Sequence, residues 1–262
     1  MKKRLLACLL TLVMLLALLP ATALAADPTT SSSCGENLTW TLTKNEDGTT
    51  YTLTISGTGE MEDYTVGGAP WHVALGAAAN RNQITKIVLP NGLTHIGNNA
   101  FLQAAVTKVE IPNTVVSIGT NAFWKCNTIE TTLPASVREL GATAFYGTFV
   151  VNVDANNPYL CSEENGKVLY SKDKTTLYQV SQDCAGDFTI PSTVTTINDY
   201  AMYGCKDTSG KLVIPDSVQT IGQAAFYGTG FTALDLGNGV KEIGTSAFNT
   251  CSNMKGDLVI PT

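Results

Sequence analysis

The sequence predicts a mainly β repeat protein, a short parallel solenoid built from small copies of one unit. The first observation is a stretch that occurs twice in succession. Residues 84–104 are ITKIVLPNGLTHIGNNAFLQA and residues 106–126 are VTKVEIPNTVVSIGTNAFWKC. The second observation is that the same marks recur to the end of the chain. Because a unit this small cannot bury its own apolar residues, the copies must stack and share one core.

Each unit begins with a predicted strand that ends at a proline. The residue before the proline is apolar, and so usually is the residue two positions earlier, which is the period of a strand with one buried face. Proline ends the strand because it has no N–H to offer a neighbour. Equivalent strands should pair in parallel, about 4.8 Å apart. The prolines are Pro90, Pro112, Pro134, Pro191, Pro215 and Pro261, and Gly237 fills the position once.

A corner and an aromatic column follow the proline in each unit. The corner position holds glycine five times and Asn198 once, and asparagine tolerates positive φ better than most residues. The pattern therefore predicts a left-handed backbone at this position. The corner glycines are Gly97, Gly119, Gly141, Gly222 and Gly244. The aromatic column, predicted to form a buried spine, is Phe101, Phe123, Phe145, Phe226 and Phe248, with Met202 in the fifth unit.

Residues 1–26 are predicted to be a secretory signal peptide. Lys2, Lys3 and Arg4 precede an apolar run, and 23–25 offer an Ala-x-Ala cleavage site. A membrane anchor is the alternative, but the run is short for a span. We therefore expect no membrane insertion after cleavage. Losing three basic and no acidic residues takes the formal net charge from −6 to −9. Such an acidic chain without a basic run argues against nucleic acid or an anionic membrane as partner.

Residues 27–83 are predicted to form a linker and an N-terminal β cap. Apolar residues alternate with threonine in 38–42 and again in 51–55, and the turn sequence Asn-Glu-Asp-Gly lies between them. This pattern predicts a β-hairpin, which would cover the open end of the solenoid. Trp71 is expected to place its indole over the first repeat.

Residues 84–262 are predicted to form the solenoid, with an insertion at 154–187 and an incomplete last repeat. The aromatic column advances by 22 to 24 residues per unit except at the fourth, where the step is 57. Residues 167–170 and 176–180 predict a hairpin there, and insertions in repeat proteins project from one face, often the binding face. The chain stops one strand into an eighth unit. We expect that the chain is truncated and that this uncapped strand could self-associate with another chain.

The units resemble the BspA-like leucine-rich repeats of bacterial surface proteins. The resemblance rests on VTKVEIPNTVVSIGTNAFWKC and LVIPDSVQTIGQAAFYGT and covers 84–262. The lead-in CGENLTWTL…TLTISGTGEMEDY…APW and the insertion VDANNPYL…GKVLYSKDKTTL are also similar to segments of that family. The resemblance implies a leucine-rich-repeat solenoid that is secreted or attached to the bacterial cell surface. It also implies adhesion to proteins or glycans of a host or neighbouring cell, and it supplies no catalytic residues.

The cysteines and histidines argue against a metal or cofactor site. Cys126, Cys205 and Cys251 share a column of small residues, which predicts buried, unpaired thiols. Cys161 and Cys184 flank the inserted hairpin and could form a disulfide, with unpaired thiols as the alternative. The chain has no Cys-x-x-Cys and only two histidines, so we expect no metal and no cofactor.

The residues that an enzyme would need have simpler explanations. His95 shares its column with Ser117, Glu139 and other polar residues, which predicts a solvent-facing position instead of a catalytic base. Four carboxylates gather in the insertion, where turns and solubility explain them, and a weak Ca²⁺ site remains the alternative. They are Asp154, Glu163, Glu164 and Asp173. We therefore predict that the chain is not an enzyme.

A row of aromatic residues is the candidate ligand-binding site. The residue after each spine position should lie nearer the surface, and in four units it is aromatic. Such a ladder could grip a sugar or an extended peptide. One alternative is that each ring packs over its neighbour and shields the core. Another is that the chain is a non-catalytic spacer or ancillary module of a larger surface protein or surface enzyme. The candidate residues are Trp124, Tyr146, Tyr203 and Tyr227.

Overall fold

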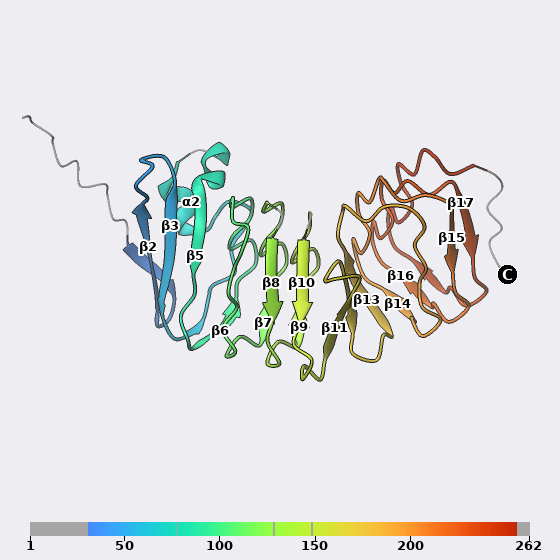
Figure 1. Ribbon diagram of the computed structural model, residues 1–262, viewed down its shortest axis with the longest axis horizontal. Helices are drawn as coiled ribbons and strands as arrows, with labels where there is room; N and C mark the ends of the chain where they lie inside the picture. The colour runs from blue at the N-terminus through green and yellow to red at the C-terminus, as the bar shows by residue number, and fades with distance from the viewer. Residues whose placement is uncertain (1–30, 77, 128, 148, 256–262) are drawn as a thin grey trace, which may run out of the picture.

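The computed structural model describes residues 31–76, 78–127, 129–147 and 149–255. The predicted signal peptide and the strand predicted at 258–260 therefore lie outside the described residues. The molecule is elongated, and its turns follow one another along the long axis from the N-terminal hairpin to β17 (Figure 1). The sequence prediction of a mainly β, parallel repeat solenoid is confirmed.

The strands at the start of the turns, most of which lead to a proline, form the first ladder of the solenoid. It contains β5 (Ile84–Val88), β8 (Ile129–Leu133), β10 (Phe149–Val153), β15 (Lys211–Ile214) and β17 (Ala233–Leu236). β8 and β10 pair in parallel, as do β15 and β17. The second and fifth turns contribute only single parallel bridges, Lys108 to Glu130 and Gly186 to Thr208.

Short strands after the prolines form a second ladder, which the sequence showed only as pairs of aliphatic residues. Within each half of the solenoid, successive strands of this ladder pair in parallel. In the N-terminal half they are β6 (Leu93–Ile96), β7 (Ser117–Ile118) and β9 (Glu139–Leu140). In the C-terminal half they are β14 (Thr196–Ile197), β16 (Thr220–Ile221) and β18 (Glu242–Ile243).

The N-terminal segment joins both ladders. β1 (Ser31–Gly35), β2 (Leu38–Lys44) and β3 (Tyr51–Gly57) form an antiparallel sheet, and β3 pairs in parallel with β5. β4 (Gly59–Glu60) pairs with β6. The helix α2 (Pro70–Ala74) is followed by the 3₁₀ helix η1 (Ala78–Gln83).

Trp71 of α2 lies over the first repeat, as expected. Its indole is fully buried and stacks on Phe101, with ring centroids 5.8 Å apart. Its Nε1–H donates to the Ala100 carbonyl at 2.8 Å. The N-terminal segment is therefore attached to the apolar spine as well as to the two ladders.

The spine of phenylalanines exists in two segments. Phe101, Phe123 and Phe145 lie in a row with ring centroids 5.3 and 5.4 Å apart. Phe226 and Phe248 continue it in the C-terminal half, 5.2 Å apart. The buried residues accordingly form two clusters, one reaching Leu169 and the other beginning at Val168. The prediction of a row of phenylalanines holds within each segment, and the fourth turn separates the two.

The prediction of a left-handed backbone at the corner glycines is wrong. The positive φ lies two residues later, for example 56° at Asn121 and 58° at Thr143. Glycine is needed for a different reason, since a Cβ on Gly141 would lie 2.3 Å from the Thr120 nitrogen. Clashes of this kind with the preceding turn recur at the other corner glycines. The column therefore marks close contact between turns.

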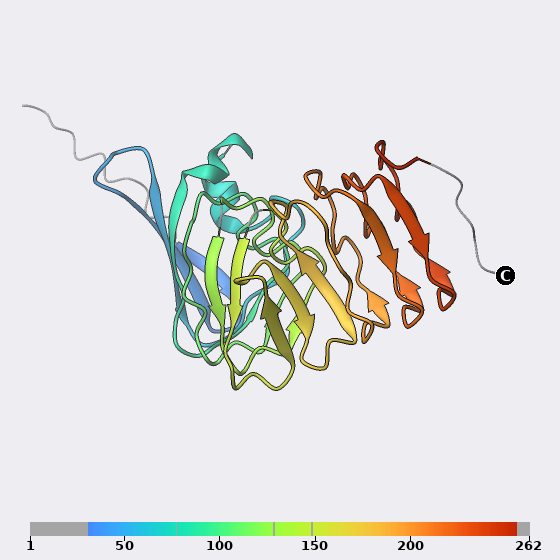
Figure 2. The ribbon, with the colours of Figure 1, turned by 45° about the vertical axis from the view of Figure 1, so that its right-hand side comes forward.

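The insertion does not project from the solenoid, contrary to expectation. β11 (Leu160–Glu163), β12 (Val168–Ser171) and β13 (Thr176–Val180) form an antiparallel meander, and β13 pairs in parallel with β14. The result is one six-stranded sheet in the order β11-β12-β13-β14-β16-β18. Figure 2 shows the yellow and orange strands following one another along the molecule. The insertion thus takes the place of the second ladder in the fourth turn.

All six cysteines in the described part of the chain are unpaired, including Cys161 and Cys184. Cys126 and Cys205 are buried, and their thiols donate to the carbonyls of Phe101 and Ser181. Burial raises the pKa of Cys126 to about 12. These thiols therefore serve as small packing groups.

Candidate functional site

The four predicted aromatic residues form one row along a flank of the solenoid. Trp124 stacks on Tyr146 with centroids 5.6 Å apart, and Tyr146 meets Tyr203 edge-on at 5.3 Å. Tyr203 stacks on Tyr227 at 4.6 Å. Because stacked rings cover one another's faces, a ligand at this row would meet ring edges and hydroxyl groups.

A pocket of about 420 Å³ opens beside this row. Trp124, Tyr146 and Tyr203 line it, whereas Tyr227 does not. Its wall also includes Thr143 and Tyr200. The volume lies in the range of sites for small ligands. The structure thus brings three of the four predicted residues to one pocket and leaves the fourth outside it.

A stack of peptide groups explains where the pocket lies. Two residues after each corner position, a left-handed residue donates its N–H to the carbonyl that follows the corner glycine of the next turn, and Tyr64 of the N-terminal segment is the donor to the first turn. Each peptide group accepts through its C=O from one turn and donates through its N–H to the next turn. The groups therefore form a column of hydrogen-bonded peptides along the solenoid. The donor–acceptor pairs are Tyr64–Asn98, Asn99–Thr120 and Asn121–Ala142, then Tyr200–Gln223 and Ala224–Thr245, with N···O distances of 2.8–3.2 Å.

The fourth turn omits its corner, and the column breaks there. Leu177 pairs with Ile197, and the Val180 amide donates to the Ala201 carbonyl, so these residues occupy regular positions of the turn. Only three positions separate Leu177 from Val180, whereas five separate Ile197 from Met202. The two missing positions correspond to Asp199 and Tyr200, the two residues that follow the corner position in the next turn.

The break leaves two peptide groups without partners. Among the described residues, no hydrogen bond is made by the Thr143 amide or accepted by the Asp199 carbonyl. The residues on the two sides of the break, Thr143 and Tyr200, both line the pocket. The pocket therefore opens where one peptide group is missing from the column.

The same break explains why asparagine, and not glycine, occupies the corner position at residue 198. In regular turns the corner glycine contacts the backbone of the preceding corner, as at Gly222, where a Cβ would lie 2.4 Å from the Asp199 nitrogen. The turn before Asn198 has no corner, so a side chain fits at this position. The substitution therefore marks the absent contact with the preceding turn and does not indicate a left-handed backbone.

Next to the break, side chains of the fourth turn make hydrogen bonds to the phenylalanine spine and to the aromatic row. Gln179 is buried, and its Oε1 accepts a hydrogen bond from the Phe145 amide at 3.3 Å. Gln182 donates from Nε2 to the Tyr146 hydroxyl at 2.8 Å and to the Tyr203 carbonyl at 3.2 Å. The fourth turn is thus closed at the spine and along the aromatic row, while the corner stays open.

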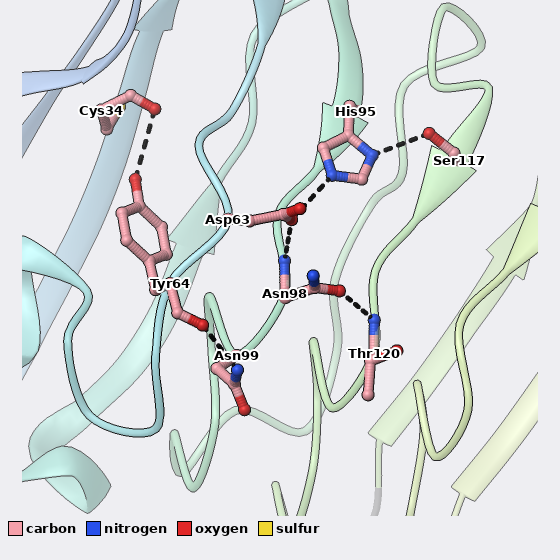
Figure 3. A network of polar contacts seen from close by, with 8 residues as sticks. All are labelled: Cys34, Asp63, Tyr64, His95, Asn98, Asn99, Ser117 and Thr120. Atoms are coloured by element: carbon pink, nitrogen blue, oxygen red, sulfur yellow. Dashed lines mark hydrogen bonds and ion pairs between the residues drawn. The ribbon is translucent and has the colours of Figure 1, made fainter.

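A second polar cluster joins the N-terminal segment to the first two turns (Figure 3). His95 makes hydrogen bonds through Nδ1 to the Ser117 hydroxyl at 2.7 Å and through Nε2 to Asp63 at 3.2 Å. The sequence predicted a solvent-facing position for His95, but its side chain is only 21% exposed. The segment carrying Asp63 covers it. Partial burial opposes the charged carboxylate, but the Asn98 amide and His95 outweigh it and lower the pKa of Asp63.

The cluster has the residue order of a hydrolytic triad but lacks the surroundings of one. Acyl transfer needs donors aimed at a developing oxyanion. Here the amides of Asn98, Gly119 and Thr120 already donate within the protein. The adjacent hollow of about 640 Å³ is lined by Glu60 and Glu62 among others, which would repel an anion. The cluster therefore acts as a clamp between the N-terminal segment and the solenoid.

Three of the four carboxylates in the insertion are engaged in local contacts. Asp154 accepts a hydrogen bond from the Asn156 amide at 2.8 Å. Asp173 accepts from the Ser171 hydroxyl, and Glu163 forms an ion pair with Lys174. These contacts fit the turn-forming duty that the sequence suggested for this group.

The fold and the pocket define a class of protein: a solenoid of short leucine-rich repeats with a non-polar pocket on one flank. The chain belongs to the family described as the BspA type leucine rich repeat region, which matches six copies over residues 76–164 and 178–261. No curated protein is similar enough in sequence to count as a match.

Two solved structures have a similar fold. A leucine-rich repeat protein from Eubacterium ventriosum is 26% identical, with a TM-score of 0.52, and the match covers 86% of this chain and 71% of that one. The pneumococcal vaccine antigen PcpA is 17% identical, with a TM-score of 0.51, over 87% of this chain and 80% of that one. The second similarity concerns the fold alone.

Proposed function

We propose that this chain is a secreted or cell-surface binding protein that holds an extracellular protein or glycan in the pocket beside Trp124, Tyr146 and Tyr203. The observation that carries the proposal is the coincidence of two features. The aromatic row and the break in the corner column meet at one pocket of about 420 Å³. We further propose that binding is not accompanied by catalysis, since the His95 cluster is a clamp.

The charge and the family support an extracellular partner. The acidic chain, with formal net charge −6, does not favour nucleic acid or an anionic membrane as partner. Membership in the BspA type leucine rich repeat family, whose repeats resemble those of bacterial surface proteins, supports a surface role. In the part of the chain that the structure describes, no helix is long and apolar enough to cross a membrane.

The second candidate is a spacer or ancillary module of a larger surface protein or enzyme. The stacking of Trp124 on Tyr146 and of Tyr203 on Tyr227 favours it, because rings that cover one another also shield the core. This candidate requires no ligand at the pocket. The two candidates therefore differ in what happens when a residue of the pocket wall is removed.

Replacing Trp124 with alanine is expected to abolish most binding, because it removes a wall of the pocket. Tyr227→Ala is the matched control, since Tyr227 belongs to the same aromatic row but lies outside the pocket. Each variant and the unmodified chain would be applied to arrays of extracellular proteins and glycans. We expect a loss of about tenfold or more in affinity for Trp124→Ala, the effect of a central aromatic contact. Equal binding by all three proteins, with folding intact, would favour the spacer.

A further inference from the structure

The gap at the fourth turn has the size and polarity of one peptide group. The column runs N–H to C=O through the groups 98–99, 120–121 and 142–143, and then through 199–200 and 223–224. Turns stack about 4.8 Å apart, so omitting one corner leaves space for one planar amide. A group that fills it must accept from the Thr143 amide and donate to the Asp199 carbonyl. A trans secondary amide presents these two functions in opposite directions.

We propose that the pocket recognises the acetamido group of an N-acetylated amino sugar. This inference rests on the proposed function and names the ligand class for the same site. The acetamido carbonyl accepts from the Thr143 amide, and its N–H donates to the Asp199 carbonyl. The sugar ring then lies against the edges of Trp124 and Tyr146. The ligand thereby supplies the peptide group that the fourth turn lacks.

The lining favours such a sugar over an extended peptide. A peptide would place further amide groups in the pocket, and each needs a partner. Beyond the two open backbone groups, the wall is mainly aromatic and aliphatic, with Lys125 as its one charged residue among those described. An amino sugar carries a single amide on a ring with apolar C–H faces. Its remaining hydroxyl groups can point to water, because the pocket is open at the surface.

The test compares sugars that differ only in the acetamido group. Diacetylchitobiose, cellobiose and chitobiose with free amines would be titrated into the full chain by calorimetry. We expect saturable binding of the acetylated disaccharide and at least about tenfold weaker binding of the other two, the effect of leaving two backbone groups unpaired. In NMR spectra the Thr143 amide should shift on binding, whereas that of Asn121, which is already bonded, should move little.

Two variants test whether the sugar binds at the missing corner of the fourth turn. Ala142→Tyr fills the pocket and should abolish binding. Thr245→Tyr introduces the same side chain in the same column, outside the pocket, and should leave binding unchanged. Circular dichroism checks that both variants fold, and the Thr143 shift in the unmodified chain tests the inference without any variant.

Three results would overturn the inference: equal binding of cellobiose, no binding of the acetylated sugar, or stronger competition at this pocket by a capped alanine peptide. If Ala142→Tyr loses a partner found on the arrays while acetylated sugars do not bind, the proposed function stands and the ligand class is wrong.

Discussion

Phe123→Ala is expected to lower the free energy of unfolding by about 3–5 kcal/mol, in the range of buried phenylalanine truncations. The side chain is 1% exposed and stands between two other rings, 5.3 and 5.4 Å away. Because every turn shares this core with its neighbours, a cavity here weakens the contacts on both sides. Urea unfolding followed by circular dichroism would measure the loss.

Phe248→Ala is the control for this prediction. Phe248 is only half-buried and contacts one other spine ring, Phe226, at 5.2 Å. It should therefore cost clearly less than Phe123. Equal losses at the two positions would mean that stacking along the spine contributes little to stability.

Gly141→Ala should destabilise the chain by about 3 kcal/mol, at the upper end of the usual effect of overpacking. The new Cβ would lie 2.3 Å from the Thr120 nitrogen and 2.6 Å from the Gly119 carbonyl carbon. Both are backbone atoms of the preceding turn, so they cannot move aside as a flexible side chain would. Thermal and urea unfolding of the variant would measure the effect.

Asn198→Ala is the matched control in the same column. The turn before Asn198 lacks a corner, so this alanine meets no backbone and should change stability only slightly. A large loss at both positions would show that the column requires a particular side chain. A small loss at both would show that the turns are less closely packed than the structure indicates.

The repeat columns predicted the solenoid because they report burial directly. The spacing of Phe101, Phe123 and Phe145 required stacked turns, and the prolines marked the strand ends. The left-handed corner was predicted wrongly because glycine serves two purposes, positive φ and the absence of a Cβ. One sequence does not distinguish them. Asn198 is compatible with either purpose, and only the contacts between turns decide.

The pocket was only partly predictable. All four aromatic residues followed from the repeat, but Tyr227 lies one turn farther from the break than Tyr203 and does not line the pocket. Tyr200 was not predicted because it lies two residues after a corner position and does not belong to the row of Trp124, Tyr146 and Tyr203. Recognising the missing corner requires knowing that Leu177 pairs with Ile197, which is a matter of strand register. The insertion replaces the repeat pattern in the fourth turn, so this register cannot be obtained by aligning the repeats.

Amide hydrogen exchange at Thr143 in the full chain tests most directly whether the corner column is broken at the fourth turn. Bonded amides of the column, such as those of Asn121 and Tyr200, are expected to exchange slowly. We expect fast exchange at Thr143 in the free protein and protection when diacetylchitobiose is added. Protection of Thr143 equal to that of Asn121 without any ligand would contradict it.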